Sequence, residues 1–494
     1  MKTLRLTLLI ALASLSLLAA RANIGLQGSG TWDDPYLINN YEDLKILSNA
    51  TNELGLDFEG MTFMLTSDIY MEHDATFVPI SSHAEKPFRG IIEGNKHSIG
   101  GWKVNTWDTD NSTEAMTERP TALVVYLGEE GSILNLTIDM SCSFTARGYF
   151  APLAYDVQGT VSHCINRADI YADHEVGGLV YRVGSTGRVD DCFNEGAITG
   201  AQRGFVGGIA ARNNGLVARS QNTGMLKGSI YAQLGGIVGE NSGGVSNCLS
   251  NGLLNGGSVI GGIVATAMPG SEVNSSLCTA VIWPGRLKDR VGAIAGGVET
   301  ADKVKFSDNC FDRQICIYDN ISDDGIKGVD TQQLIDTIWS GSRAWTKQEG
   351  MYPQLWTFHQ ERTSILGAAT IVFKHGDTRL TMSAPAKLYH NLTDSFWWTL
   401  DGDEAFYLDD EGRLVVKPCD HDVSTILYAN HGAKFRFIPV TALATQVDIN
   451  DVNMVINLIL DLDIDNPDYN GDINGDGSVD IDDVNMLINQ ILAQ

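Results

Sequence analysis

Small and β-branched apolar residues alternate at short spacings through the middle of the chain, and glycines punctuate them at a constant interval of 28 residues. The glycines in this register are Gly131, Gly159, Gly187, Gly215 and Gly243. Two positions after each glycine the same β-branched row recurs, in the series Ile133, Val161, Val189, Val217, Val245 and Val273. A fixed period of this size indicates a solenoid, in which every repeat is one coil stacked on its neighbours.

Three further rows recur at fixed offsets from these glycines. They are Leu136, Cys164, Cys192, Ser220, Cys248 and Ser276, then Ile138, Asn166, Asn194, Asn222, Ser250 and Cys278, and finally Cys142, Ile170, Ile198, Leu226, Leu254 and Ile282. If similar residues of successive coils stack every ~4.8 Å, each short strand pairs with the strands of the coils above and below it. We therefore expect a right-handed parallel β-helix, in which the asparagine amides hydrogen-bond along their ladder and to the turn backbone.

Coil length drifts at two places, between Ile198 and the next Gly-Gly-Ile and again after Ile282, which predicts loop insertions there. A helical repeat protein is the alternative architecture for a period of this size. Glycines and β-branched residues interrupt every helical period in this region, so strands are favoured.

Two segments beyond the repeats have different patterns. Residues 365–440 contain alternating stretches at 369–373, 413–416 and 434–438, separated by polar turns, which predict a small immunoglobulin-like β-sandwich. Residues 441–494 contain apolar residues at helical spacing twice, which predicts two helices with one apolar face each.

Oxygen-bearing side chains precede the last of these helices at the spacing of a calcium loop. They occupy loop positions 1, 3, 5, 9 and 12, with a glycine at position 6 and a backbone carbonyl offered at position 7. Ca²⁺ prefers oxygen ligands in this order along a twelve-residue loop. The candidate ligands are Asp472, Asn474, Asp476, Ser478, Asp480 and Asp483. We expect one bound Ca²⁺, and the alternative is an acidic turn that binds no ion.

A similar loop and helix string occurs once more, shortly before this one, but it lacks the ligands. The residues that align with Asp472, Asn474 and Asp476 are Val440, Ala442 and Ala444, none of which can bind Ca²⁺. Asp448 and Asp451 remain as the acids of this first copy. The duplication therefore predicts one intact calcium site and one half that is poor in ligands.

The N-terminal segment has the pattern of a secretory signal peptide: a basic start, an apolar run and an Ala-Arg-Ala end. No cysteine stands at this junction, so a lipoprotein is not expected, and no other stretch is apolar for long enough to predict a membrane span. A net charge of −27 makes nucleic acid an unfavourable partner. The 52 glycines favour many turns and short strands. We expect a secreted or cell-surface protein.

Eight cysteines raise the question of disulfides in an exported chain. Five of them, Cys142, Cys164, Cys192, Cys248 and Cys278, fall on ladder rows that also hold serine and aliphatic residues. This interchange favours small buried thiols over disulfide bridges. Cys310 and Cys316 lie off the rows and are the better candidates for a disulfide.

The register also allows a search for catalytic acids, because two carboxylates one coil apart would have the separation used by retaining glycosidases. No acid in residues 159–282 aligns with another acid one period away. Instead Asp191 falls between His163 and Arg219, Glu195 follows Arg167, and Glu240 follows Arg212, whereas Asp169, Asp190 and Glu272 align with neutral residues. Opposite charges in register suit a solvated outer face, and a catalytic His-Asp-Arg row is the less favoured alternative.

Other candidate sites are weaker still. His174-Glu175 lacks the second histidine of a zinc protease helix, and no nucleophile elbow or phosphate loop is present in the sequence. Trp397 and Trp398 could form a platform for sugars, although paired tryptophans in a sandwich more often divide between core and surface. We therefore predict no catalytic residue.

Two family resemblances follow from these motifs. The tandem loop and helix units, with Asp483 rather than glutamate at position 12, resemble a type I dockerin. The turns at 177–180, 207–209, 235–239 and 261–264 look like the GLUG repeat of secreted bacterial adhesin-like proteins. Segments at 28–38, 42–54 and 88–99 are similar to the N-terminal cap of those proteins, and 345–355 is similar to their C-terminal end.

Together these features predict a signal peptide in residues 1–22, a cap with the first coils in 23–120 and a GLUG-type β-helix in 121–358. An immunoglobulin-like sandwich follows in 365–440 and a dockerin-like calcium module in 441–494. The resemblances imply an adhesin-like interaction protein whose partner is a cohesin-like or surface protein, or a glycan. Because dockerins commonly attach glycan-degrading proteins to scaffolds, the alternative is a tethered glycoside hydrolase or lyase.

Overall fold

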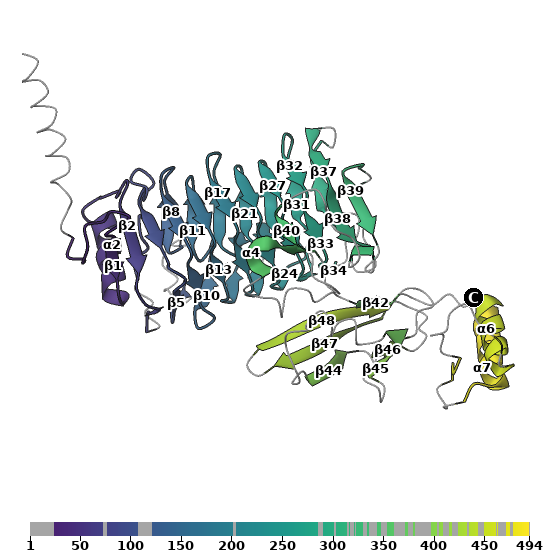
Figure 1. Cartoon of the computed structure of the whole chain (residues 1–494). Coiled ribbons are helices and arrows are strands. Elements are labelled where there is room, and N and C mark those ends of the chain that lie inside the picture. The colour runs from purple at the N-terminus through teal and green to yellow at the C-terminus, as the bar shows by residue number, and fades with distance from the viewer. Residues whose placement is uncertain are drawn as a thin grey trace, which may run out of the picture. The chain divides into compact units, whose positions relative to one another are not determined.

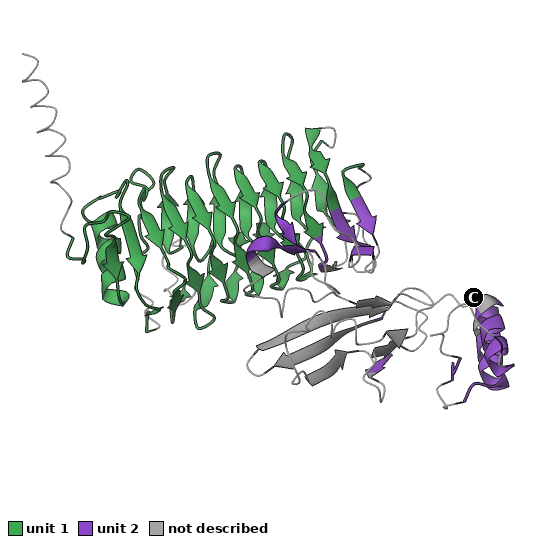
Figure 2. Ribbon diagram, viewed as in Figure 1, with its two compact units in different colours: residues 1–277, 282–309, 320–326 green, residues 278–281, 310–319, 327–494 purple. Residues whose placement is uncertain are grey.

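The computed structural model describes most of the repeat region and selected parts of the C-terminal third. The described residues are 24–72, 77–106, 121–200, 204–284, 290–300, 303–313, 316, 321, 323–329, 333–334, 343–346, 353–359, 371–373, 379–380, 397–402, 405–408, 414–416, 423–431, 434–442, 449–460, 462, 471–474 and 478–493. The predicted signal peptide lies outside them. The chain divides into two compact units, one of residues 1–277, 282–309 and 320–326, and one of residues 278–281, 310–319 and 327–494 (Figure 2).

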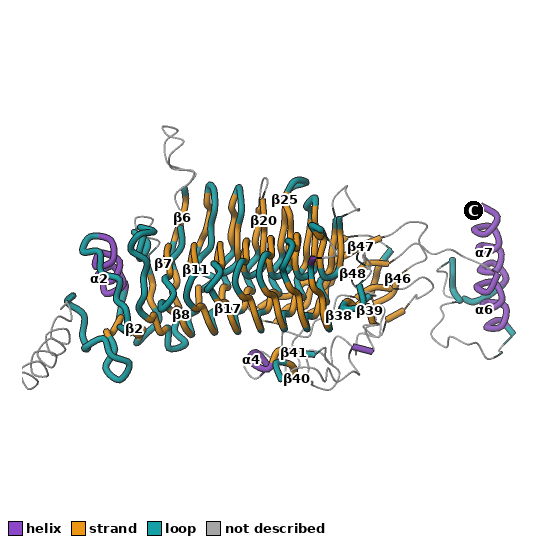
Figure 3. Tube along the Cα trace, turned by 90° about the horizontal axis from the view of Figure 1, so that it is seen from above, coloured by secondary structure: helices purple, strands orange, loops and turns teal. Residues whose placement is uncertain are grey.

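The first unit is a β-solenoid built from short parallel strands, with successive coils running side by side (Figures 1 and 3). Sheet A contains β1 (Tyr36–Ile38), β2 (Thr62–Leu65), β4 (Ile91–Glu93), β8 (Ser132–Leu134), β12 (Thr160–Ser162), β17 (Arg188–Asp190), β22 (Leu216–Ala218), β27 (Gly244–Ser246), β32 (Glu272–Asn274) and β37 (Lys305–Ser307). Sheet B contains β3 (Ile69–Tyr70), β5 (Ser98–Gly100), β9 (Thr137–Ile138), β13 (Ile165–Asn166), β18 (Phe193–Asn194), β23 (Gln221–Asn222), β28 (Leu249–Ser250), β33 (Leu277–Cys278), β38 (Asn309–Asp312) and β39 (Ile326–Val329).

Three further sheets complete the coils. Sheet C contains β7 (Val124–Leu127), β11 (Ala154–Val157), β16 (Val180–Val183), β21 (Ala210–Asn213), β26 (Val238–Asn241), β31 (Val264–Ala267) and β36 (Ala295–Val298). Sheet D contains β6 (Lys103–Asn105), β10 (Ser143–Ala146), β14 (Ile170–Ala172), β19 (Ile198–Gly200), β24 (Leu226–Gly228), β29 (Leu253–Asn255) and β34 (Val281–Trp283). Sheet E contains β15 (Val176–Gly177), β20 (Gly204–Gly207), β25 (Ala232–Gly235), β30 (Val259–Gly261) and β35 (Val291–Gly292).

The predicted register is confirmed over the central coils of sheet A. Val161 pairs with Ile133 on one side and with Val189 on the other, and the same step continues to Val217, Val245 and Val273. All six residues of this row are fully buried. The row therefore forms part of the solenoid core, as its periodicity predicts.

Coil length changes where the sequence predicts insertions. Val176 pairs with Val206 and Val273 pairs with Phe306, so both of these coils are longer than the regular period. One predicted member of the aliphatic row is wrong, because Phe144 rather than Cys142 pairs with Ile170. Cys142 instead ends a turn in which its backbone N–H donates to the Asp139 carbonyl, so the strand begins one residue later.

The paired glycines of the turns between sheets E and C are required by close backbone approaches. A Cβ atom on Gly235 would lie 1.7 Å from the Val238 carbonyl oxygen within its own turn. A Cβ atom on Gly236 would lie 1.9 Å from the Gly262 carbonyl oxygen of the next coil. No side chain fits at either distance, which explains why paired glycines recur in the turns of this type.

Helix α2 (Tyr41–Asn52) follows the first strand of the solenoid and lies close to the predicted helix at 42–54. Asn40 precedes it, and its side-chain oxygen accepts a hydrogen bond from the backbone N–H of Asp43 at 3.1 Å, as an N-cap does. Leu44 and Leu47 form the buried side of this helix. The cap is therefore helical where the pattern of the sequence predicts it.

The second unit contains short strands and helices with their own sheets. A hairpin pairs β40 (Trp345–Thr346) with β41 (Gln354–Leu355) and precedes α4 (Trp356–His359). One sheet has the order β42 (Ile371–Phe373), β48 (Lys434–Ala442), β47 (Val423–His431), β44 (Trp397–Gly402), and another the order β43 (Arg379–Leu380), β46 (Leu414–Val416), β45 (Phe406–Leu408). Strands therefore occur where the immunoglobulin-like sandwich is predicted. The last elements are α6 (Ile449–Ile459) and α7 (Ile481–Ala493).

Candidate functional site

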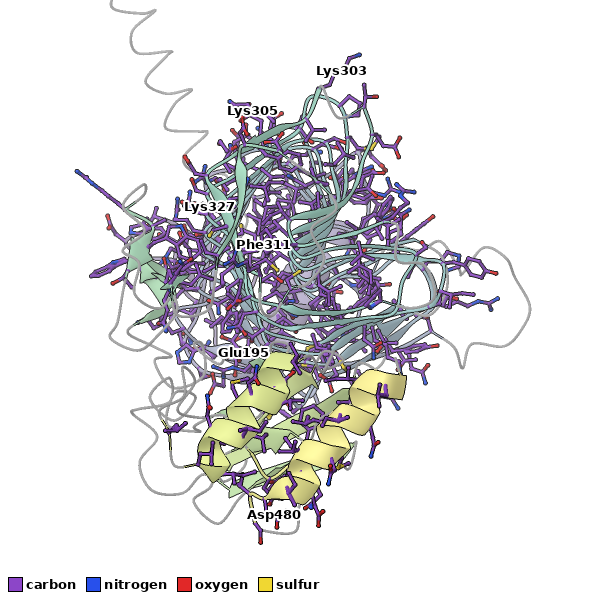
Figure 4. All side chains as sticks on the ribbon, turned by 90° about the vertical axis from the view of Figure 1, so that its right-hand side faces the viewer. Glu195, Lys303, Lys305, Phe311, Lys327 and Asp480 are labelled. Carbon is purple, nitrogen blue, oxygen red and sulfur yellow. The ribbon has the colours of Figure 1, made fainter. Side chains whose placement is uncertain are left out.

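The predicted calcium ligands lie in and just after the loop before α7, which begins directly after Asp480 (Figure 4). The structure describes Asp472, Asn474, Ser478, Asp480 and Asp483, and Asp476 lies outside the described residues. The loop starts beside α6, because Ile473 belongs to the buried cluster that also contains residues of both helices. Both ends of the predicted ligand set are thus anchored in one small core.

Asp483 is the buried centre of this loop. Its Oδ1 accepts backbone N–H groups from Ile473 at 2.8 Å and Asn474 at 3.0 Å, and its Oδ2 accepts the N–H of Asp480 at 2.9 Å. Burial alone would raise the pKa of Asp483, but the hydrogen bonds from Asp480, Asn474 and Ile473 hold that pKa below its ordinary value. The carboxylate at loop position 12 is therefore kept ionised and binds both flanks of the loop together.

Asp480 has a second role in the same loop. Its Oδ1 accepts the backbone N–H of Asp482 at 2.9 Å, so it caps the start of α7. The donor set is of the right type for Ca²⁺, because every predicted ligand offers oxygen and the central carboxylate is ionised. Within the described part of the chain, no three histidine, cysteine, aspartate or glutamate side chains are grouped to hold a metal ion.

The segment that aligns with this loop in the first copy begins as a strand, in the part that the structure describes. Val440 and Ala442 belong to β48, where they pair with Thr425 and Val423 of β47. Ala444 and Asp448 lie outside the described residues, and Asp451 belongs to the first turn of α6. The first copy therefore differs from the second in backbone conformation as well as in ligands.

Helices α6 and α7 pack side by side through a small apolar core (Figure 4). Val452, Val455, Val484 and Leu487 are buried there with Ile473. Several apolar side chains of the pair and of the residues beside it are instead exposed, namely Ile449, Ile459, Leu460, Leu462, Val479, Ile481, Met486, Ile488 and Leu492. The apolar faces of the two helices thus hold more side chains than the core between the helices buries.

The charged rows of the solenoid form ion pairs between adjacent coils, as predicted. Arg167 Nε donates to Glu195 Oε2 at 2.9 Å, and Arg219 Nε donates to both oxygens of Asp191 at 3.1 Å. Arg212 also pairs with Glu240. His163 lies in the same row as Asp191, and its Nδ1 is 2.8 Å from the Ser162 hydroxyl.

Two acids have charged partners that the register search missed. Asp190 pairs with Arg188 at 2.6 Å and with Arg219. Glu272 pairs with Lys305 at 3.2 Å, and this hydrogen bond lowers the pKa of Glu272. The in-register neighbours of Asp190, Ser162 and Ala218, are neutral as predicted, so its charged partners lie off the register, whereas the prediction is wrong for Glu272. Arg219 reaches Asp190 diagonally from the next coil, and Lys305 follows a coil that is longer than the regular period.

A second cluster, which sequence reasoning also missed, lies on the outside of sheets C and E. Glu175, of which 7% is exposed, accepts hydrogen bonds from Arg212 Nε at 2.6 Å and Nη2 at 2.7 Å. The Tyr181 hydroxyl donates to Glu175 Oε2 at 3.2 Å. Arg212 and Glu175 are 37 residues apart, so a search at the regular period does not align them.

Aromatic rings continue from this cluster across neighbouring coils. We call Tyr126, Tyr149, Tyr155, Tyr181 and His174 the aromatic strip. The Tyr155 and Tyr181 rings stack with centroids 4.5 Å apart, and Tyr126 meets Tyr155 edge-on at 6.4 Å. Tyr149 lies 5.2 Å from Tyr181 and 6.0 Å from His174. Burial raises the pKa of Tyr155 to about 12, so its hydroxyl stays protonated.

The ladder cysteines are buried thiols, as their interchange with serine predicts. Cys164, Cys192, Cys248 and Cys278 are fully buried and form no disulfide. Burial raises the pKa of Cys248 to about 12, which makes its thiolate scarce at neutral pH. The structure does not join Cys310 and Cys316, the two predicted disulfide candidates. Trp397 and Trp398 belong to β44, and their side chains lie outside the described part of the chain.

None of the described helices is both long and apolar enough to cross a membrane. No protein-family model matches the chain. A stretch of 164 residues, 33% of this chain, is 29% identical to Halomucin of Haloquadratum walsbyi and spans only 2% of that protein. A crystal structure of a candidate immunoglobulin A1 protease from Bacteroides ovatus superposes on 67% of this chain and 94% of its own, with a TM-score of 0.42 and 18% identity. Neither similarity assigns an activity to this chain.

Proposed function

We propose that the chain is an exported, adhesin-like protein that binds its target through the side of the solenoid. The ion pairs that join adjacent coils support this proposal best. Asp191 and Glu195 are each held by an arginine of an adjacent coil, and Glu175 is held bidentately by Arg212. The arginines that hold them keep about a third of their side chains exposed, at 37% for Arg167, 32% for Arg212 and 36% for Arg219, so a rigid surface presents fixed hydrogen-bond donors to a ligand.

The proposal extends to the C-terminal module. Asp472, Asn474, Asp476, Ser478, Asp480 and Asp483 would hold one Ca²⁺, and the charge of the ion would fix the loop that joins the two helices. The exposed apolar side chains of α6 and α7 would then bind a protein partner, as in a dockerin-like module. Their number on so small a pair of helices supports a docking role.

Retention and turnover assays on the whole exported chain test the main proposal. The chain is passed over immobilised mucin, collagen, pectin, xylan and chitin, and the same materials are assayed for new reducing ends or unsaturated products. We expect retention on at least one material without product. Product formation would instead identify a polysaccharide-degrading enzyme, and failure to bind any of the five would contradict the adhesin proposal.

Chelation tests the calcium module separately. If Ca²⁺ binds only the folded module, a hundredfold excess over Kd stabilises it by about 2.7 kcal/mol. Adding a chelator should therefore speed amide hydrogen exchange in residues 471–493 and leave the solenoid strands unchanged. Unchanged exchange in both regions would show that the loop does not bind Ca²⁺.

A further inference from the structure

The aromatic strip joins side chains from several consecutive coils into one continuous surface. Tyr126 belongs to β7, Tyr155 to β11 and Tyr181 to β16, which are adjacent strands of sheet C. Tyr126, Tyr149 and Tyr155 are half-buried, so parts of their rings remain accessible. The side chain of His174 is 47% exposed at the end of the strip. The accessible rings thus lie on neighbouring coils, with Tyr126 on one coil, Tyr149 and Tyr155 together on the next, and His174 on the one after.

The fold itself does not require large rings at these positions. Tyr155 and Tyr181 occupy equivalent positions of β11 and β16, because the residues on either side of them pair between these strands. The pairing of the following strands places Ala211, Gly239 and Ala265 at the same position, so these residues continue the row of sheet C. Ala211 and Ala265 are fully buried and maintain the same sheet with a methyl group. Tyrosine therefore occupies only two coils of a row that valine, alanine or glycine satisfies elsewhere, which indicates a role other than holding the coils together.

Hydrogen-bonding groups with fixed orientation border the rings. His174 Nδ1 lies 2.9 Å from Oδ1 of Asp173, a residue of which 3% is exposed. This hydrogen bond engages Nδ1 and leaves the other ring nitrogen, Nε2, as a group that can donate or accept. On the other side Arg182, paired with buried Asp156, keeps a side chain that is 44% exposed and offers N–H donors. The strip thus combines aromatic faces with both donors and acceptors.

These features favour a carbohydrate over a protein as the occupant. The centre of a protein interface is depleted in charged groups, whereas charged and polar side chains surround these tyrosines on both sides. A sugar ring has an apolar C–H face for an aromatic ring and a rim of hydroxyl groups that both donate and accept hydrogen bonds.

We propose that the aromatic strip binds a carbohydrate chain, with sugar rings stacked on Tyr149 and Tyr155 and hydroxyls bonded to His174 and Arg182. The inference rests on the proposed binding function and names the ligand class and the surface. Glu175 and Arg212 act as positioning residues, because they fix the Tyr181 hydroxyl from below rather than face the ligand.

Calorimetric titration of the whole exported chain tests the proposal. The probes are hexasaccharides of cellulose, chitin, xylan, α-1,4-glucan and polygalacturonate, which separate neutral from acidic sugars. We expect at least one to bind, Tyr149→Ala to weaken that binding about tenfold, and Tyr155→Phe to change it less than threefold because the ring remains. The matched control is Tyr171→Ala on β14, a tyrosine that is 38% exposed on sheet D and should leave binding unchanged.

The outcomes separate this inference from the proposed function. If the chain is retained on collagen but binds none of the hexasaccharides, the carbohydrate assignment is wrong and the adhesin proposal stands. If a hexasaccharide binds but Tyr149→Ala and Tyr171→Ala weaken it equally, the site lies elsewhere. Equal thermal melting of both variants and the parent chain verifies that a loss of binding is local to the strip.

Discussion

The solenoid and the C-terminal helix pair both bury a polar side chain in a turn, and they support it in opposite ways. In the solenoid, Asn166 Nδ2 donates to Asn194 Oδ1, and Asn194 Nδ2 donates to Asn222 Oδ1, both at 2.8 Å. In the helix pair, the single carboxylate of Asp483 accepts three backbone N–H groups. The first arrangement repeats a neutral group along the axis, and the second relies on one charge.

This difference has consequences for stability. Each amide of the ladder also bonds its own turn, as when Asn194 Nδ2 donates to the Gly196 carbonyl at 2.9 Å. A neutral amide does not titrate, so the ladder should hold at any pH at which the chain stays folded. Asp483 must stay ionised to accept its three donors. The helix pair should therefore respond to pH and to cations, and the asparagine ladder should not.

The largest expected effect tests how strictly the solenoid backbone is packed. Gly235→Ala would place a Cβ atom 1.7 Å from the Val238 carbonyl oxygen, so the turn must open. We expect a loss of about 4 kcal/mol in the free energy of unfolding, measured by denaturant titration. The control is Gly244→Ala, where the nearest atom is the mobile end of Leu216 at 3.3 Å and the change should stay below about 1 kcal/mol.

Removing one rung of the amide ladder should have the next largest effect. Asn194→Ala deletes the bonds to Asn166 and Asn222 and leaves buried amide groups unsatisfied. We expect a cost of about 3 kcal/mol, by the same titration. Ser250 occupies the same row beside Asn222, and its buried hydroxyl has no hydrogen-bond partner. Ser250→Ala should therefore be nearly neutral, and an equal cost for both variants would contradict the ladder argument.

In the helix pair, Asp483→Asn should cost about 2 kcal/mol of local stability at pH 7, because the charge that accepts the backbone N–H groups is lost. The folded pKa of Asp483 lies below its unfolded value, so its contribution is present above an unfolded pKa of about 3.9 and is lost as pH falls through the folded pKa. After correction for the intrinsic exchange rate, protection of the α7 amides should rise with pH through this range in the parent chain only. If the pH dependence of α7 amide protection is the same in the parent chain and in Asp483→Asn, the role of the Asp483 charge is contradicted.

The smallest effect is expected for an exposed ladder pair. Arg167→Ala removes a contact to Glu195 in which both side chains reach water, so the cost should stay below about 1 kcal/mol. Arg219→Ala is the sharper comparison, since its partners Asp190 and Asp191 are buried and would lose their main counter-charge. The melting temperature of Arg219→Ala should be well below that of Arg167→Ala. The reverse order would show that burial does not determine how much these ion pairs contribute to stability.

The sequence predicted the rows of the solenoid because residues one period apart contact each other when the coils stack. The asparagine ladder, the buried thiols and the Arg219–Asp191 pair all follow from one constant step along the chain. The prediction failed where coil length departs from this step. Phe144 pairs with Ile170 across a shorter coil, and Lys305 reaches Glu272 only after a longer one.

For the predicted calcium loop, the order of oxygen-bearing residues predicts Asp483 as the closing acid, since loop spacing is a local property of the chain. That both of its oxygens would bind backbone N–H groups could not be read from spacing, because these bonds depend on how the loop folds back over the start of α7. The aromatic strip had no signal at all in the sequence. Its members come from different parts of adjacent coils, and the Glu175–Arg212 pair beside it spans two sheets and more than one coil.

The sequence by itself thus determined the repeat, the residues of the core rows and the candidate ligands of the loop, because each depends on spacing within one coil or one turn. Only the tertiary structure decided which charges meet diagonally and which rings gather on the outside of sheets C and E. The physical reason is that the turns between sheets vary in length from coil to coil. Each change shifts the side chains of one sheet relative to the next, and only the folded coils show where they meet.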